Sequence, residues 1–127
     1  MERGITERIE QFEHKGKRFI YFDLSGLQNN VQFKEMTEGA KKIIAEYPPD
    51  GSSFSITNIE GVIYDTETKN IVSAWMEFNR PYIKQGAVIG LDGIKRIMVN
   101  SILKMSGRNN MKFFRTREEA VEWLAAL

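Results

Sequence analysis

The sequence predicts an α/β domain in which a mixed, mostly parallel sheet is covered by helices, with the element order ββαβαβαβα. Two observations predict it. The first 24 residues contain two strand-like runs around a glycine turn, and the rest of the chain alternates short apolar runs with segments of helical periodicity. We therefore expect one antiparallel strand, followed by parallel strands that right-handed helical crossovers connect.

The N-terminal segment is predicted to form a hairpin. Residues 8–14 and 18–24 are its two strands, and Lys15-Gly16-Lys17 is the turn between them. The second strand contains the nearly continuous apolar run Phe-Ile-Tyr-Phe over 19–22, which predicts that it is covered on both faces. The first strand mixes apolar and charged residues, and this mixture favours the edge of the sheet.

The middle of the chain predicts two helices and a strand. Apolar residues at helical spacing predict a helix over 33–47, which the sequence Pro48-Pro49-Asp50-Gly51 ends. Alternating apolar and hydroxyl residues predict a half-buried strand over 53–59. Asp65 then opens a second helix, whose apolar stripe extends to Phe78.

The last third of the chain predicts two more strand–helix units. Residues 85–91 form a short buried strand, and a helix follows from Asp92 to Met105, with Gly107 as its left-handed cap. Residues 111–115 are the last strand, and Thr116-Arg117-Glu118-Glu119 predicts a capping box for the final helix. Because ligands and partners of such sheets meet the loops at the carboxyl ends of the strands, we expect function in loops 24–31, 57–66, 90–94 and 115–117.

Composition indicates a single domain, which we place at residues 1–127. The chain is 42% hydrophobic and 28% charged, as in ordinary globular proteins. It has no cysteine, which excludes disulfides, thiolate catalysis and cysteine-based metal centres. The sequence shows no signal-peptide core and no apolar run long enough to span a membrane, so we expect a cytoplasmic protein.

Charge is balanced overall but divided unevenly along the chain. The net charge is +1, with −3 over residues 1–82 and +4 over residues 83–127. The basic residues of the second part are mainly Lys95, Arg96, Lys104, Arg108, Lys112, Arg115 and Arg117. We interpret them first as a solvated surface, and second as a surface for an acidic protein partner. Nucleic-acid binding would need a larger basic excess and exposed aromatic residues, so none is expected.

Three segments of the sequence resemble a known family. Residues 56–66, together with the order of the elements, look like the STAS domain of anti-sigma-factor antagonists, and 87–93 and 114–124 are similar to its SpoIIAA-like branch. The resemblance covers nearly the whole chain. It implies a regulatory domain of bacterial type that docks a protein partner through a phosphorylatable hydroxyl at the start of the second helix.

That position corresponds to Thr66. The family pattern Asp-Ser-Ser-Gly is Asp65-Thr66-Glu67-Thr68 here, so the hydroxyl is kept as threonine and the glycine is absent. Asn58, Asp65, Thr66 and Thr68 are therefore the candidate phosphoacceptor or partner-binding residues. Asp and Thr at a helix start also cap backbone N–H groups, and we favour this structural role over a regulatory phosphate.

A second, weaker candidate site follows the strand predicted at 85–91. Gly90-Leu91-Asp92-Gly93-Ile94-Lys95-Arg96 combines a glycine turn, a helix start and two basic residues, which is the general form of an anion site. Gly93, Lys95 and Arg96 are its candidate residues. Neither GxGxxG nor GxxxxGK[ST] is present, so a tight turn explains the glycines equally well.

The sequence shows no recognisable catalytic pattern. His14 is the only histidine, and it falls on the predicted edge hairpin. Neither Ser25-Gly26 nor Ser106-Gly107 forms a nucleophile elbow, and Asp23 alone does not supply the acidic cluster of a receiver domain. We therefore expect no enzyme, no metal site and no cofactor.

The leading hypothesis is a regulatory module that binds an unidentified protein partner, and the sequence leaves homodimer formation open. The alternative is a sensor of a small lipid-like or nucleotide-like ligand, held between helices and sheet. The six methionines and both tryptophans fall mostly on apolar stripes, which we interpret as core packing.

Overall fold

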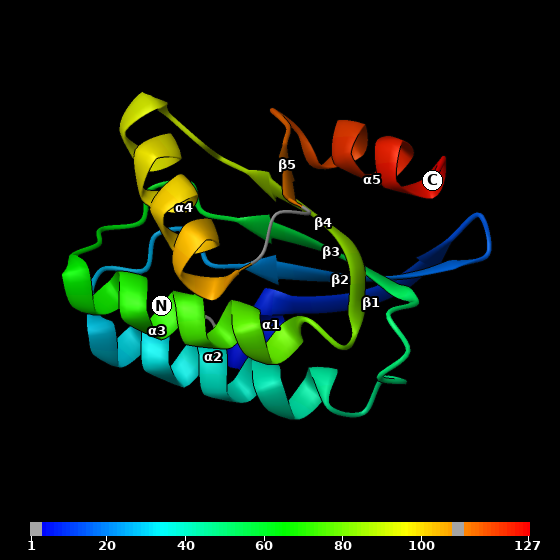
Figure 1. Cartoon of the computed structure of the whole chain (residues 1–127), viewed down its shortest axis with the longest axis horizontal. Helices are drawn as coiled ribbons and strands as arrows, with labels where there is room; N and C mark the ends of the chain where they lie inside the picture. Colours follow the sequence, from blue (N-terminus) through cyan, green and yellow to red (C-terminus); the bar gives the residue numbers. More distant parts are fainter. Residues whose placement is uncertain (1–3, 108–110) are drawn as a thin grey trace.

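A computed structural model describes residues 4–107 and 111–127, where five strands form one sheet and five helices surround it (Figure 1). Arg108 lies outside these residues. The strands are β1 (Ile9–His14), β2 (Lys17–Asp23), β3 (Ser53–Asn58), β4 (Ile83–Ile89) and β5 (Met111–Phe113). The helices are α1 (Ile5–Arg8), α2 (Asn30–Ile44), α3 (Thr66–Asn79), α4 (Gly93–Ser106) and α5 (Arg117–Ala125).

The predicted element order and sheet are confirmed. The strands lie in the order β1-β2-β3-β4-β5, in which β1 pairs antiparallel with β2 and the later neighbours pair in parallel. The hairpin turns at Lys15 and Gly16, which both have positive φ, as a tight two-residue turn requires. As predicted, β1 is an edge strand, and β2 is covered on both faces.

The one element that the sequence did not predict is α1, a helix of four residues. Helices of one turn carry too little periodicity to be seen in a sequence. Tertiary contacts hold α1 in place, because Ile5 packs against Gly39 of α2 and the Arg8 guanidinium donates to the carbonyls of Asp23 and Ser25 at 2.9 Å each.

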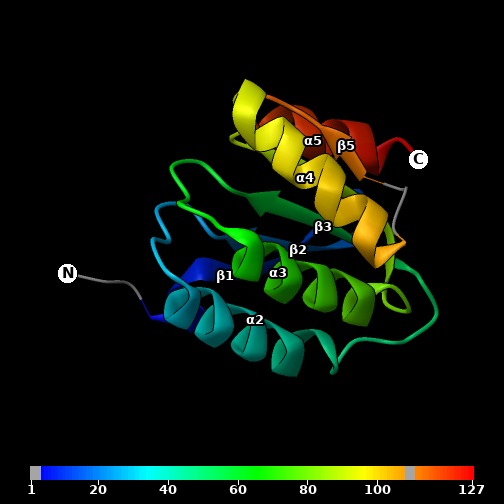
Figure 2. The ribbon, with the colours of Figure 1, turned by 60° about the vertical axis from the view of Figure 1, so that its left-hand side comes forward.

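The helices divide unequally between the two faces of the sheet. The larger core joins Ile20 and Phe22 of β2 to residues of α2, α3 and α4, whereas the smaller core joins Phe19 of the same strand to Ala120 and Leu124 of α5. In Figure 2, α2 and α3 lie side by side on one side of the sheet and α5 lies on the other. The chain therefore changes face between α4 and α5.

Most predicted boundaries agree with the structure, and two segments shift. The helix predicted over 33–47 begins earlier, because the Asn29 side chain caps it by accepting from the Gln32 N–H, and it ends at Ile44. Tyr47 follows in the next turn and remains buried. The strand predicted over 85–91 occupies 83–89 instead. Gly107 is the left-handed cap of α4, as predicted.

Candidate functional site

The loops predicted to carry function meet at one edge of the molecule, because β2 to β5 run parallel. Backbone hydrogen bonds tie neighbouring loops together there. The Gly26 N–H donates to the Glu60 carbonyl at 2.9 Å, and the Ile63 N–H donates to the Leu27 carbonyl at 2.9 Å. The loops after β2 and β3 therefore form one continuous surface.

Asp65 and Thr68 build the start of α3. The Asp65 carboxylate accepts from the Thr68 N–H at 2.9 Å, and the Asp65 N–H donates to the Thr68 hydroxyl oxygen at 3.1 Å. This reciprocal pair is a capping box, which satisfies two backbone donors that a helix start leaves unpaired. The structural role that the sequence favoured for these two residues is therefore present.

Asn30, the first residue of α2, joins this cap to the neighbouring helix. Its side-chain amide donates to both Asp65 carboxylate oxygens and to Glu67, each at 3.2 Å, while its carbonyl oxygen accepts from the Thr68 hydroxyl at 2.6 Å. The Thr68 N–H and the Asn30 amide together lower the pKa of the Asp65 carboxyl. A network of four side chains thus locks the two helix starts to each other.

The four residues predicted for partner binding have different environments. Thr68 is buried within the cap, at 2% exposure, whereas Thr66 is exposed at the first position of α3. Asn58, at the end of β3, accepts from the Glu60 N–H at 3.0 Å and donates to the Tyr21 hydroxyl at 3.1 Å. Of the two threonine hydroxyls, that of Thr66 is therefore the one exposed to another molecule.

Two exposed apolar side chains lie on the segments that form this site. Ile63, in the loop before α3, is 59% exposed, and Val31, in the first turn of α2, is 66% exposed. The sequence analysis missed both, because an isolated apolar residue in a loop or first turn has no periodicity to mark it. Val31 directly follows Asn30 in the chain, and Ile63 precedes Asp65 by two residues, so both belong to the segments that the Asn30–Asp65 hydrogen bonds join.

The structure gives the three residues of the weaker predicted anion site different environments. Asp92 caps α4 by accepting from the Lys95 N–H at 2.8 Å, and it also pairs with the Lys95 ammonium group at 3.2 Å. Arg96 stacks on the Phe113 ring instead, with its guanidinium 4.9 Å from the ring centroid. Gly93 has no atom within 4 Å of its missing Cβ, so it faces open space.

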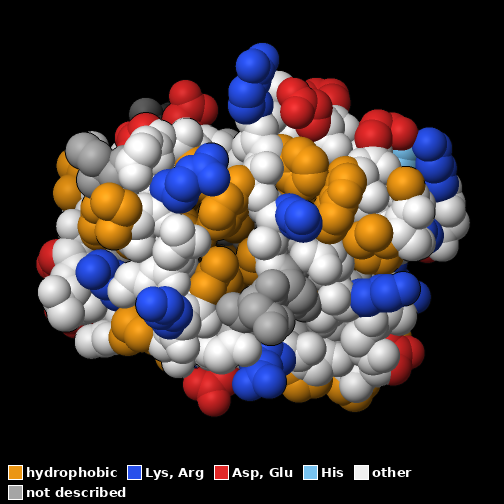
Figure 3. Space-filling model, turned by 45° about the horizontal axis from the view of Figure 1, so that its top comes forward, with side chains coloured by type: hydrophobic (Ala, Val, Ile, Leu, Met, Phe, Trp, Pro, Cys, Tyr) orange, Lys and Arg blue, Asp and Glu red, His pale blue; other side chains and the backbone are white. Residues whose placement is uncertain are grey.

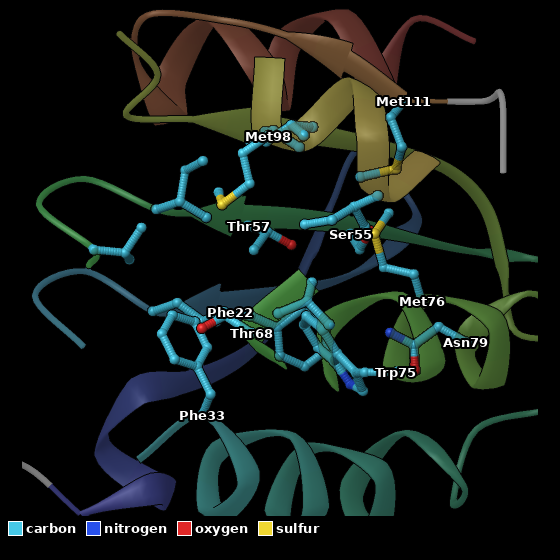
Figure 4. A pocket seen from close by; sticks show the side chains of 17 residues that line it. Phe22, Phe33, Ser55, Thr57, Thr68, Trp75, Met76, Asn79, Met98 and Met111 are labelled. Carbon is cyan, nitrogen blue, oxygen red and sulfur yellow. The ribbon is translucent and has the colours of Figure 1, made fainter. Parts of the chain in front are cut away.

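An apolar cavity of about 40 Å³ lies between the sheet and helices α3 and α4 (Figure 4). Met76, Met98 and Met111 line it from three different elements. Met76 and Met98 are buried, as core packing predicts, yet they also form the wall of this space. Figure 3 shows the outer surface of this part of the molecule, hollowed between hydrophobic side chains with Lys and Arg around them.

On two residues that line this cavity, one buried polar atom each lacks a hydrogen-bond partner among the described residues. The atoms are the Trp75 indole N–H and the Asn79 side-chain carbonyl, on residues that are 2% and 4% exposed. Buried donors and acceptors without partners are rare and cost free energy, so a bound water or another small molecule would stabilise both.

Other chemistry-bearing residues lie apart from these sites. The His14 ring is 2.9 Å from the Glu122 carboxylate on the surface of the hairpin and α5. Over residues 4–107 and 111–127, no group of three metal-ligating side chains occurs. No helix in the same ranges has the length and apolar character needed to cross a membrane.

The fold defines the class of protein: an α/β domain with the STAS/SpoIIAA-like fold, as the sequence resemblance predicted. An uncharacterised protein with a SpoIIAA-like fold from Shewanella loihica matches with a TM-score of 0.66, over 91% of both chains at 15% identity. An anti-sigma-factor antagonist (STAS) domain protein from Planctomyces limnophilus matches with a TM-score of 0.59, over 94% of this chain and 98% of that one at 13% identity.

Sequence comparison adds one partial match. The alpha subunit of translation initiation factor 2 from Archaeoglobus fulgidus is 32% identical over 60 residues, which are 47% of this chain and 22% of that protein. The chain therefore matches less than a quarter of that relative's length. No family model matches the chain.

Proposed function

We propose that this protein is a non-enzymatic regulatory module that binds a protein partner at the surface formed by Val31, Ile63 and Thr66. The observation that carries the proposal is the exposure of these three side chains on a locked frame. A partner would bury the two apolar side chains and reach the Thr66 hydroxyl, while the frame would need little rearrangement. The STAS domain protein among the structural neighbours is described as an anti-sigma-factor antagonist, which supports a partner-binding role.

Asp65, Thr68 and Asn58 would support this surface without forming its contacts. Each is engaged in the hydrogen bonds that hold the helix starts and the β3 loop. Their removal would change binding through the shape of the surface. They are positioning residues in this proposal, and Thr66 is the contact residue.

Charge around Thr66 argues for direct contact as the main use of its hydroxyl. The Asp65 and Glu67 carboxylates flank it in the sequence, and both accept from the Asn30 amide. A phosphate on Thr66 would bring a charge of about −1.5 to −2 next to them. Phosphorylation, where it occurred, would therefore repel an acidic partner and disturb the Lys34–Glu67 pair, whose charged atoms are 3.5 Å apart.

Matched substitutions test the partner surface. The partner of the wild-type protein is first identified by cross-linking and mass spectrometry, and its affinity is then measured for purified variants. Ile63→Ser and Thr66→Glu are each expected to weaken binding at least about fivefold, as loss of a significant contact does. Ile97→Ser, at an isoleucine that is 73% exposed on α4, and Thr6→Glu, at an exposed threonine of α1, are the controls.

The controls decide the outcome. If Ile63→Ser and Thr66→Glu both bind the partner as tightly as the wild type, this surface does not bind the partner and the proposal is wrong. Equal losses in the control variants would show that binding depends on general surface properties and would also contradict the proposal. Circular dichroism checks that all four variants stay folded.

A second candidate function is a sensor of a small, mainly apolar ligand in the cavity between α3, α4 and the sheet. The unpartnered Trp75 N–H and Asn79 carbonyl favour it, because a ligand with one acceptor and one donor would satisfy both. Three methionines in the wall can repack around a guest larger than the present space.

Thermal-shift screening with fatty acids and nucleosides tests this candidate. A ligand at 100 times its dissociation constant adds about 2.7 kcal/mol of stability. Val72→Phe, which fills the cavity from α3, is expected to abolish the added stability, and Trp75 fluorescence gives an independent reading of occupancy. A flat screen, or an unchanged response in the filled variant, would contradict this candidate.

A further inference from the structure

A different part of the same edge forms a crevice, which lies outside the carboxyl ends of β4 and β5. The loop after β4 supplies Gly90, and α4 supplies Arg96. Strand β5 and the segment after it supply Phe113, Phe114 and Arg115, and α5 supplies Glu119. The crevice has a volume of about 280 Å³. We call it the β4–β5 crevice. Arg96 belonged to the weaker predicted anion site, and Gly90 and Arg115 lie in loops that the sequence predicted to carry function.

The topology explains why a crevice forms here. The helices that follow β2, β3 and β4 all pack on one face of the sheet, whereas α5, which follows β5, packs on the other. The connections of β4 and β5 therefore leave the sheet edge in opposite directions. In open α/β sheets such a switch point separates two neighbouring loops and creates the space in which ligands bind.

The two arginines give the crevice its chemistry. Arg96 lies with its guanidinium over the Phe113 ring, which fixes the plane of the group and leaves its edge N–H donors available. Arg115 is exposed and lines the same space. Within the described part of the chain, no carboxylate forms an ion pair with either guanidinium. Two guanidiniums that line one crevice without a described ion-pair partner match an oxyanion with several acceptor oxygens.

The rest of the lining limits the ligand. The N-termini of α4 and α5, with their positive dipole ends, lie at the same edge, although the Asp92 cap offsets the first of them. Glu119 contributes one negative charge against the two arginines. Phe114, held by Trp123 with 5.4 Å between ring centroids, forms an apolar wall. Sites for drug-sized ligands occupy roughly 300–1,000 Å³, so this crevice suits a smaller molecule.

From this arrangement we propose that the β4–β5 crevice binds a small organic phosphate monoester, with Arg96 and Arg115 on the phosphate and Phe114 against the organic group. This site is separate from the partner surface at Thr66. Either proposal stands if the other fails, because they rest on different residues and different measurements.

The experiment is a ¹H–¹⁵N NMR titration of the full chain with phenyl phosphate and, separately, with inorganic phosphate at matched ionic strength. Phenyl phosphate is expected to shift the amide signals of residues 90–96 and 113–117 along a saturable curve, and to bind more tightly than inorganic phosphate. Arg115→Gln and Arg96→Gln are each expected to weaken binding about tenfold, the loss of one charged hydrogen-bond donor. Glu119→Gln is expected to tighten it.

Lys42→Gln is the matched control, because it removes one positive charge at an exposed position of α2. It is expected to leave the affinity unchanged. Three results would overturn the proposal: shifts that do not saturate, equal weakening by Lys42→Gln and Arg115→Gln, or inorganic phosphate that binds as tightly as phenyl phosphate. Arg96→Gln also removes the packing of Arg96 on Phe113, so a structural change could weaken its binding. In that case the affinity of Arg115→Gln alone tests the proposal.

Discussion

The two halves of the carboxyl-terminal edge of the sheet hold their polar side chains in opposite ways. At the β2–β3 half, Asn30, Asp65 and Thr68 satisfy one another, so the helix starts are locked together. At the β4–β5 half, Arg96 and Arg115 line a crevice and make no ion pair with a described carboxylate. One half is a closed polar network, and the other is open to an anion.

The difference follows from where the helices go. Helices α2 and α3 pack side by side on one face, so their first residues meet and exchange hydrogen bonds. Helices α4 and α5 leave on opposite faces, so their first residues diverge and space remains between them. The direction of the connections therefore determines whether polar residues at helix starts stabilise the fold or remain free for a ligand.

The largest expected effect comes from the residue between the two halves. Gly90 has a φ of 82°, and a Cβ there would lie 2.6 Å from the Glu60 backbone nitrogen and 2.7 Å from the Asn58 side-chain oxygen Oδ1. Gly90→Ala should therefore combine a strained backbone with a clash, and lower the free energy of unfolding by more than about 2 kcal/mol. Urea denaturation measures this loss.

The control for that substitution lies three residues later. A Cβ on Gly93 would meet no atom within 4 Å, and this residue begins α4. Gly93→Ala is expected to be neutral or to stabilise the protein by up to about 1 kcal/mol. Equal losses in the two variants would mean that the close approach at Gly90 does not join the two halves of the edge.

A smaller effect separates the buried and exposed threonines of the closed half. Thr68→Val keeps the shape of the side chain but removes the hydroxyl from Asn30 and from the Asp65 N–H, so we expect a loss of about 1–3 kcal/mol. Thr66→Val alters an exposed hydroxyl and should change stability by less than about 0.5 kcal/mol. Thermal or urea denaturation measures the free energy of unfolding of both variants. Equal losses of stability in Thr68→Val and Thr66→Val would contradict the structural role assigned to Thr68.

Sequence patterns predicted the features that are determined by residues close together in the chain. The periodicities and turn residues predicted the sheet and four of the helices, and the Asp65 cap follows from a local motif. They could not predict contacts between distant segments. Asn30 and Asp65 are 35 positions apart, and nothing near either residue indicates the other. In the same way, the handedness of crossovers does not fix the face on which α5 packs, because α5 does not connect two strands of this sheet. The sequence therefore indicated the loops at 90–94 and 115–117 without showing that they enclose a crevice.

The smallest effect concerns the ionisation of Asp65. Hydrogen bonds from the Thr68 N–H and from the Asn30 amide lower its pKa, so Asn30→Ala should raise that pKa while leaving it below the usual value for aspartate. A lowered pKa stabilises the fold above the unfolded-state pKa, and this contribution is lost as pH falls through the folded-state pKa. The loss should therefore begin at higher pH in the variant. Carboxyl ¹³C NMR titration measures the pKa directly.

Asp50 serves as the internal reference in that titration. Its pKa is also lowered, chiefly by a hydrogen bond from Ser52, and it has no contact with Asn30 among the interactions of the described residues. Asn30→Ala should therefore leave the Asp50 titration unchanged. An Asp65 pKa that is the same in wild type and variant would mean that Asn30 does not bind the carboxylate in solution. The two helix starts would then be joined by the Thr68–Asn30 hydrogen bond and the Lys34–Glu67 ion pair without the Asn30–Asp65 bonds, and the closed half would differ less from the open one.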